Sequence, residues 1–433
     1  MIQSRALLSV FAVLAFYLVL AGDSLRYSLS WYGWGVVAIA VAAISVVILV
    51  RLRSTWRLNR LPYPLIAFVA ITILSLAWSD YTAWTAIGIV LNLMAVVAGA
   101  ALAIALTRTE VLWALGTALR FALGLSLLFE LVVAVIIRHP ILPWWENFGT
   151  EKIHAADYWS RDLLFTGKQI QGVMGNSNLL GFVALLGLIV FAIQLASRTV
   201  TKIWGIFWIV VAVACIALTR SATVTIALGI VAVAAIILLL LRAQRGGRGR
   251  LVVSILSIAF VVAAGIGGFV FRVKVFELLG KNGTLTGRTG IWTNVIALAS
   301  QRPIQGWGWV GYWNPFVKPF TSSKFNLGGV QYLQAHDAWL DVWFQIGIVG
   351  LIVFVAFVLS TVVRTWILSI DRSGIDVGKR GPRDPISLLA VLVVIALVAQ
   401  SFTESRLIIE YGILLMTLFA VRSKRDLMEP AVA

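Results

Sequence analysis

The chain has 433 residues, of which 61% are hydrophobic and 12% are charged, and its mean hydropathy is +0.97. Soluble domains are about half apolar and about a quarter charged, so this composition excludes a soluble globular protein. It predicts an all-α polytopic membrane protein. The net charge of +17 does not indicate nucleic-acid binding, because the basic residues form short clusters between apolar runs. The single cysteine, Cys215, excludes an intrachain disulfide and a cysteine metal cluster.

About twelve apolar stretches approach the length of about 20 residues that a membrane span needs. They lie near 6–22, 33–50, 62–79, 84–106, 114–137, 173–195, 203–219, 222–241, 251–271, 338–363, 386–401 and 408–421. Basic clusters follow the second, fourth, sixth, eighth, tenth and last stretches. Alternating spans put all these clusters on one side, which predicts that this side and both termini are cytoplasmic. The first stretch has no convincing cleavage site, and we expect it to remain as a signal anchor.

These stretches divide the chain into three regions. Residues 1–271 hold spans one to nine, with an outer polar loop at 138–171. Residues 272–337 form a large extracytoplasmic loop between spans nine and ten, and residues 338–433 hold the last three spans and a cytoplasmic tail. The large loop is rich in tryptophan, whereas disordered segments are poor in aromatic residues. We therefore expect this loop to fold and to carry the chemistry.

Two arginines are candidates for binding phosphate groups through their planar, permanently charged forks. Arg220 lies between two apolar runs, where a charge is costly and rarely without a role. Arg288 lies in the first turn of a predicted helix that runs through Ile296 and that Thr284 or Thr286 would cap. The free N–H groups of that turn favour an anion. The alternatives are an arginine that reaches the membrane interface at 220 and a surface arginine at 288.

His336 lies between the large loop and the tenth span. A histidine titrates near neutral pH and can take a proton from a sugar hydroxyl. The alternative is a hydrogen-bonded histidine at the interface. Asp337 and Asp341 lie one and five residues later, and neither has the ideal helical spacing for a His–Asp pair. Glu130 lies deep in the fifth span, where a carboxylate either is functional or has a structural partner such as an arginine.

Several other polar and aromatic side chains are candidates for sugar contacts. The start of the sixth span carries Gly175, Asn176 and Asn178, which belong to a helix cap or contact sugar. Trp292 and Trp307 could stack on sugar rings, although interfacial aromatic belts explain such residues equally well. The sequence has no Gly-rich nucleotide loop, no HExxH motif and no Ser/His/Asp set, so it predicts no cofactor and no metal.

Four stretches between about residues 170 and 360 form an ordered series: VMGNSNLLG, LTRSATVTIALG, TGRTGIWTNVIALASQRPIQGWGWVGY and AHDAWLDVWFQIGIVGLI. Together they resemble the O-antigen ligase and Wzy-like polysaccharide polymerase superfamily. The resemblance implies a GT-C-like membrane glycosyltransferase that takes glycan from undecaprenyl pyrophosphate on the outer face of the cytoplasmic membrane. Such an enzyme passes the glycan to a hydroxyl of a glycan or glycolipid acceptor without a nucleotide sugar or a metal.

The resemblance also implies roles for individual residues. Arg220 and Arg288 match the arginines held to grip the pyrophosphate, and His336 matches the histidine held to activate the acceptor. Two positions depart from the family pattern. Asp337 stands where asparagine is common and would tune the choice of acceptor. Arg302 stands before the loop proline and would be a third phosphate contact.

The motifs do not separate a ligase from a Wzy-type polymerase, so both activities stay open. A secondary transporter or lipid flippase is a third class, for which we expect scattered ionisable residues at mid-membrane and paired broken helices. This chain has few such residues, and its polar residues gather in outer loops. A non-enzymatic scaffold does not explain why two arginines and a histidine converge on one face.

Overall fold

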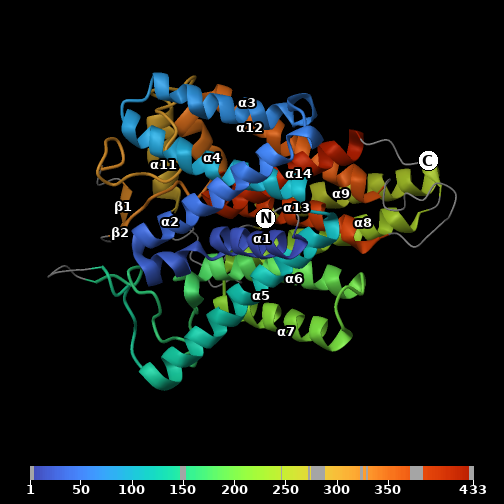
Figure 1. Ribbon diagram of the computed structural model, residues 1–433, viewed down its shortest axis with the longest axis horizontal. Helices are drawn as coiled ribbons and strands as arrows, with labels where there is room; N and C mark the ends of the chain where they lie inside the picture. Colours follow the sequence, from blue (N-terminus) through green and yellow to red (C-terminus); the bar gives the residue numbers. More distant parts are fainter. Residues whose placement is uncertain are drawn as a thin grey trace.

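The computed structural model describes residues 4–146, 153–244, 246–271, 274, 288–321, 325–327, 330–370 and 384–428. Figure 1 shows that these residues are mostly helical. The helices are α1 (Arg5–Leu20), α2 (Gly22–Arg51), α3 (Tyr63–Leu74), α4 (Thr82–Ala105), α5 (Arg108–Val132), α6 (Ser177–Ala196), α7 (Lys202–Thr219), α8 (Ala222–Ala243), α9 (Gly247–Val270), α11 (Arg288–Ala299), α12 (Ala338–Ile370), α13 (Leu388–Ser401) and α14 (Glu410–Met428). Apart from α11, each coincides with one of the predicted apolar stretches.

Eight of the described helices are long and apolar enough to cross a membrane, namely α2, α4, α5 with its terminal π-helical turn (Val133–Ile137), α6, α7, α8, α9 and α12. The apolar helices α1, α3 and α13 are shorter. The prediction of an all-α polytopic membrane protein is therefore confirmed.

Local sequence signals fix where several helices begin. Thr107 and Glu110 form a capping box at α5, in which each side chain accepts the backbone N–H of the other. Asn176 accepts the N–H of Asn178 at the start of α6, and Ser221 caps α8. The Ser221 hydroxyl also donates to Oδ1 of Asn178 (2.7 Å). The first turns of α6 and α8 are therefore held side by side.

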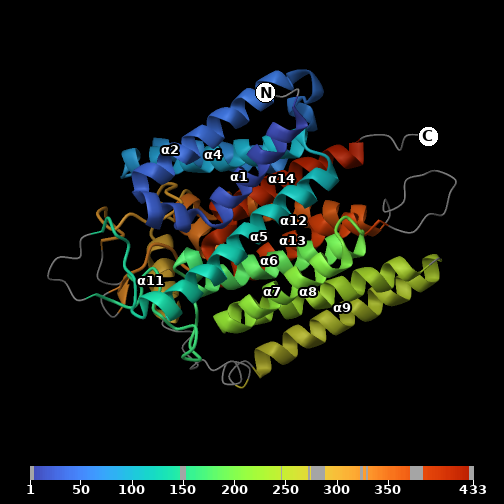
Figure 2. The ribbon, with the colours of Figure 1, turned by 60° about the horizontal axis from the view of Figure 1, so that its bottom comes forward.

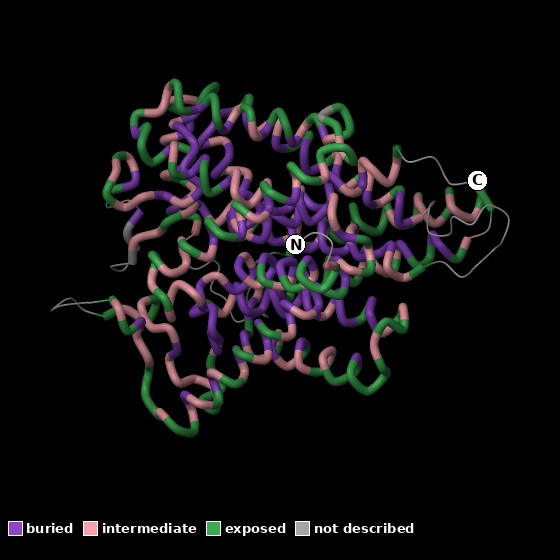
Figure 3. Tube along the Cα trace, viewed as in Figure 1, coloured by how far each residue is buried: buried purple, intermediate pink, exposed green. Residues whose placement is uncertain are grey.

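The helices pack in layers around a buried centre. Figure 2 shows α2 and α4 on one side of the bundle and α7, α8 and α9 on the other. Between them, α14 packs against α4 and α12, while α6 packs against α5 and α7. Figure 3 shows that the buried residues concentrate in this centre. Helix α9 packs on α8 and buries no residue of its apolar window, so it lies at the periphery of the bundle.

The polar loops gather at one end of the bundle. Helix α11, the two short strands and the loop that follows α5 lie at the left in Figure 1, whereas the basic turn between α8 and α9 lies at the opposite end. This separation agrees with the alternation of spans from which we predicted the topology. Which end faces the outside of the cell stays a prediction.

The described part of the large loop has its own apolar core. It is formed by Tyr81, Ile291, Val295, Ala299, Val310, Trp313, Phe320, Phe325, Ala335 and Phe344. Strand β1 (Asn326–Leu327) pairs antiparallel with β2 (Val330–Gln331) beside this core. The helix predicted from Arg288 through Ile296 is confirmed as α11. Its predicted caps, Thr284 and Thr286, lie outside the described residues.

The loop is joined directly to α12, which is interrupted at Ile346 and Gly347. Three backbone hydrogen bonds join the loop to α12 around this interruption. With the donor named first, they are Trp307 to Phe344 (3.1 Å), Gly308 to Gln345 (2.8 Å) and Ile348 to Pro303 (2.8 Å). Gly347 has a φ of 70°, and a Cβ there would lie 2.0 Å from the carbonyl oxygen of Ile304. Only glycine allows the loop to approach the helix this closely.

Candidate active site

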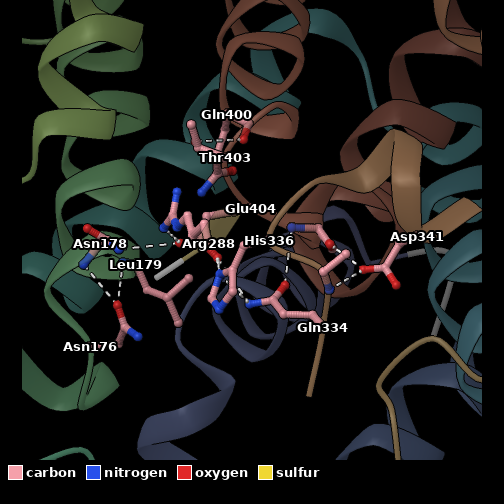
Figure 4. Close-up of polar contacts among 12 residues, drawn as sticks. Asn176, Asn178, Leu179, Arg288, Gln334, His336, Asp341, Gln400, Thr403 and Glu404 are labelled. Atoms are coloured by element: carbon pink, nitrogen blue, oxygen red, sulfur yellow. Dashed lines mark hydrogen bonds and ion pairs between the residues drawn. The ribbon is translucent and has the colours of Figure 1, made fainter. Parts of the chain in front are cut away.

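Glu404 lies in the turn between α13 and α14 and is 4% exposed. Figure 4 shows that side chains from several elements surround it. Its Oε1 accepts hydrogen bonds from Arg288 (2.8 Å) and Asn178 (3.3 Å). Its Oε2 accepts one from Gln334 (3.0 Å) and lies 2.9 Å from Nδ1 of His336. This carboxylate therefore joins α6, α11, the large loop and its own turn at one point.

The contact with Glu404 fixes how His336 is protonated. An ionised carboxylate only accepts hydrogen bonds, so Nδ1 of the neutral ring carries the hydrogen and Nε2 is the basic nitrogen. The backbone of His336 has a φ of 53°, a left-handed conformation that is uncommon for residues other than glycine. The ring of Tyr332 packs edge-on against the imidazole, with 5.5 Å between ring centroids. A histidine held in this way can accept a proton at Nε2.

The charge of Glu404 is set by its neighbours. Burial by itself raises the pKa of this carboxyl. The hydrogen bond from His336, the charge that the imidazole carries in acid, and the charges of Arg288 and Arg406 outweigh burial and lower the pKa to about 2. Glu404 therefore stays ionised at neutral pH. It can hold Arg288 in place and can stabilise a positive charge on the imidazole.

The two predicted phosphate-binding arginines lie at helix ends. Arg288 opens α11, and its described contacts with Glu404 use Nη2 alone. Arg220 follows α7 in a left-handed conformation and is exposed, and no described carboxylate pairs with it. Ser221, the next residue, donates to Asn178, which in turn donates to Glu404. A chain of hydrogen bonds therefore connects the turn of Arg220 to the Glu404 cluster.

Two of the predicted sugar contacts adjoin His336. The indole N–H of Trp292 donates to the carbonyl oxygen of Ala335 (3.0 Å). Asp337 caps α12 by accepting two N–H groups of its first turn, both at 2.9 Å. Burial raises the pKa of Asp337, against the effect of these two hydrogen bonds. Both residues thus support the backbone on either side of the histidine.

Arg302 and Trp307 lie away from this cluster. Arg302 follows the far end of α11, and the helix itself separates it from Arg288 by about 16 Å at 1.5 Å per residue. Its guanidinium pairs with Asp80 (2.5 Å) and lies 4.3 Å from the ring centroid of Trp307. The structure therefore gathers Arg288, His336 and Asn178 around Glu404, but it does not bring Arg302 or Trp307 there.

Glu130 is buried near the end of α5, with 1% of its surface exposed. It accepts the N–H groups of Gln171 (2.9 Å) and Gly172 (2.7 Å) and the hydroxyl of Ser160 (3.1 Å). Of its two predicted roles, these contacts support the structural one, with backbone and hydroxyl groups as the hydrogen-bond donors. Glu130 therefore anchors the loop that precedes α6.

Sequence reasoning does not identify Glu404 or Gln334. One signal was available for Glu404, because a carboxylate in a short turn between two apolar spans is costly to bury unless it is paired. Its partners, however, lie between 68 and 226 residues away. Among the residues that the structure describes, no group of three or more His, Cys, Asp or Glu side chains could hold a metal ion.

Residues 207–355 match the family model described as O-antigen ligase. Over these residues the chain is similar to the O-antigen ligase family. The resemblance seen in the sequence motifs is thereby confirmed. The O-antigen ligase segment runs from α7 into α12 and contains Arg220, Arg288 and His336, whereas Asn178 and Glu404 lie outside it. The cluster is thus shared between the family segment and the helices that flank it.

The chain is also similar to the exopolysaccharide production protein ExoQ of Rhizobium meliloti (strain 1021). The two are 26% identical over 200 residues, which cover 42% of this chain and 43% of the relative. The chain therefore spans less than half of the length of this curated relative.

Proposed function

We propose that this protein is a membrane enzyme that transfers or polymerises glycan, moving it from a lipid-linked donor to an acceptor hydroxyl. The observation that carries the proposal is the position of His336 against the ionised carboxylate of Glu404, beside Arg288. A buried carboxylate behind a histidine is the arrangement that prepares a general base. The adjacent arginines suit a phosphate-containing leaving group.

The proposed reaction is a single displacement. The acceptor oxygen forms a bond to the anomeric carbon of the donor sugar while the bond from that carbon to a phosphate oxygen breaks. Nε2 of His336 takes the proton of the hydroxyl, and Glu404 stabilises the imidazolium that results. Arg220 and Arg288 offset the negative charge of the departing pyrophosphate.

We propose undecaprenyl pyrophosphate as the carrier of the donor glycan and the outer face of the cytoplasmic membrane as the place of the reaction. An apolar cavity of about 130 Å³ lies between α2, α4 and α14, and Ile408 and Glu410 line it beside the turn of Glu404. Such a cavity suits part of an apolar chain. The gathering of the polar loops at the end opposite the basic turn supports the assignment of the face.

The remaining predicted contacts differ in how directly the geometry supports them. Asn178, Trp292 and Asp337 adjoin the cluster, and we propose that they contact glycan near the acceptor. Arg302 and Trp307 lie at the other end of α11. They would reach the substrate only where it extends along that helix.

The test is a transfer assay with purified protein in liposomes, an undecaprenyl-pyrophosphate-linked oligosaccharide as donor and chelator present throughout. We expect release of undecaprenyl pyrophosphate by the wild type and a loss of release in His336→Ala. Longer lipid-linked chains identify a polymerase, and glycan on a separate acceptor identifies a ligase. Movement of intact donor across the bilayer without cleavage would instead identify a transporter and refute the enzyme.

A further inference from the structure

Asp341 lies in the first turn of α12 and is fully buried, with 0% of its surface exposed. Its two oxygens accept four hydrogen bonds. The donors are the backbone N–H of Ala335 (2.9 Å), the hydroxyl of Ser405, the indole N–H of Trp313 (2.8 Å) and the amide of Gln345 (3.3 Å). A buried carboxylate is costly unless such donors satisfy it.

Two of these donors are the sequence neighbours of the reacting pair. Ala335 precedes His336, and Ser405 follows Glu404, and both donate to the same oxygen, Oδ2 of Asp341. In Figure 4, Asp341 lies to the right of Gln334 and His336, on the side opposite Asn178. One oxygen atom thus ties together the two chain segments whose side chains meet at the His336–Glu404 contact.

We propose that Asp341 is a positioning residue that sets the distance between His336 and Glu404. This inference rests on the proposed function, in which His336 is the general base. None of the four hydrogen bonds of Asp341 reaches the imidazole, so it acts through the two segments that it ties. A displacement of about 1 Å at a reacting group can cost about 10²-fold in rate.

A carboxylate suits this position. Three of the four partners can only donate, namely the N–H of Ala335, the indole of Trp313 and the amide of Gln345. The N–H₂ group of Asp341→Asn would therefore face at least one obligate donor in either orientation of the amide. The substitution keeps the size of the side chain but weakens the hydrogen bonds at Oδ2, which come from Ala335 and Ser405. Trp313 and Gln345 take part in the core of the large loop, and their side of the carboxylate can be satisfied by the amide oxygen.

The experiment is a double-mutant cycle in the liposome transfer assay. We expect Asp341→Asn alone to lower kcat about 10²-fold, with little change in the KM for donor. In the His336→Ala background the same substitution should cost less than about threefold, because the group through which it acts is gone. A purely structural role would lower activity by the same factor in both backgrounds, and that result would overturn the proposal.

Glu130→Gln is the matched control. Glu130 is also a buried carboxylate with backbone and hydroxyl donors, but its partners adjoin neither His336 nor Glu404. We expect its effect to be the same factor with and without His336. If Asp341→Asn does not fold, Ser405→Ala removes one tie to Oδ2 and should give a smaller loss that also disappears in the His336→Ala background.

The positioning role and the proposed function can fail separately. A wild type without transfer would refute the function. Hydrogen exchange would then test whether Asp341 holds the two segments together. Asp341→Asn should speed the exchange of backbone amides at both 333–337 and 403–407. Unchanged exchange at either segment would overturn it.

Discussion

Glu130 and Glu404 are both buried carboxylates at the loop end of the bundle, and their donors differ in kind. Glu130 accepts two backbone N–H groups and one hydroxyl from a single loop. Glu404 is surrounded by an arginine, a histidine and two amide side chains from three separate segments. Backbone donors fix the path of a chain, whereas converging ionisable side chains create local chemistry. The comparison teaches that the partners of a buried charge, rather than its burial, distinguish a site from an anchor.

The largest effect is expected from removing His336, the histidine that contacts Glu404. His336→Ala should slow transfer by about 10²–10⁴-fold, because acid–base catalysis typically contributes that much. Donor should remain bound through the arginines. The measurement is donor binding and transfer by the purified variant. The exposed His139 supplies the control, since His139→Ala should behave like the wild type. Full transfer by stable His336→Ala protein would exclude the general base.

Replacing each carboxylate by its amide compares the two sites directly. Glu404→Gln should lower transfer about 10²-fold, because it removes the charge behind His336 and faces donors with an N–H₂ group. Glu130→Gln should mainly lower the midpoint of thermal unfolding, because an unsatisfied buried donor costs about 1–3 kcal/mol. Both effects are measured on equal amounts of monodisperse protein. Equal losses of transfer in the two variants, at equal stability, would contradict the assignment of Glu404 to the active site and of Glu130 to a structural role.

The arginines test whether charge alone suffices around Glu404. Arg220→Lys and Arg288→Lys keep the charge but lose the planar fork. Each should lose a charged hydrogen bond of about 1.5–3 kcal/mol, or roughly ten- to a hundredfold in turnover. Arg302→Lys is the matched comparison and should have a smaller effect, because Arg302 pairs with Asp80 at the far end of α11. A larger loss for Arg302→Lys than for Arg288→Lys would place the phosphate groups elsewhere.

The smallest effect concerns stability in acid. The pKa of Glu404 is lowered from about 4.5 to about 2 in the folded protein, so the unfolded chain takes up its proton first as the pH falls. The stabilisation is complete above about pH 4.5 and is lost as the pH falls toward 2. The difference in unfolding midpoint between wild type and Glu404→Gln should therefore shrink below pH 4.5. A difference that stays constant down to pH 3 would contradict the ionised cluster.

The sequence predicted the helices well, because each apolar stretch is long and flanked by charges. It also singled out Arg288, His336 and Asn178, which the structure brings together around Glu404. Their residue types stand out where spans and loops meet, and their role in the site stays a prediction. The cap prediction for the start of α6 is explained by Asn176, whose side chain accepts the N–H groups of the first turn. Local signals of this kind act over a few residues and can be read directly.

The pairing of these residues could not be predicted. Glu404 meets His336 across 68 residues and Arg288 across 116 residues, and no periodicity encodes such contacts. The same limit applies to Arg302. The family resemblance implies a phosphate contact for Arg302, whereas its partner Asp80 comes from the turn before α4. The five residues from His336 to Asp341 argue against a direct pair, and the structure places that aspartate behind the histidine's backbone instead.

The interruption in α12 has a mechanical consequence. The segment from Pro303 to Gly308 supplies a donor or an acceptor to each of three groups on α12 around Gly347. The loop cannot swing away from the membrane helix as a separate lid without breaking all three hydrogen bonds together. We therefore expect this segment and the start of α12 to move together. Such a movement would carry His336 with it, whereas Asn178 and Arg220 belong to other elements, the start of α6 and the end of α7.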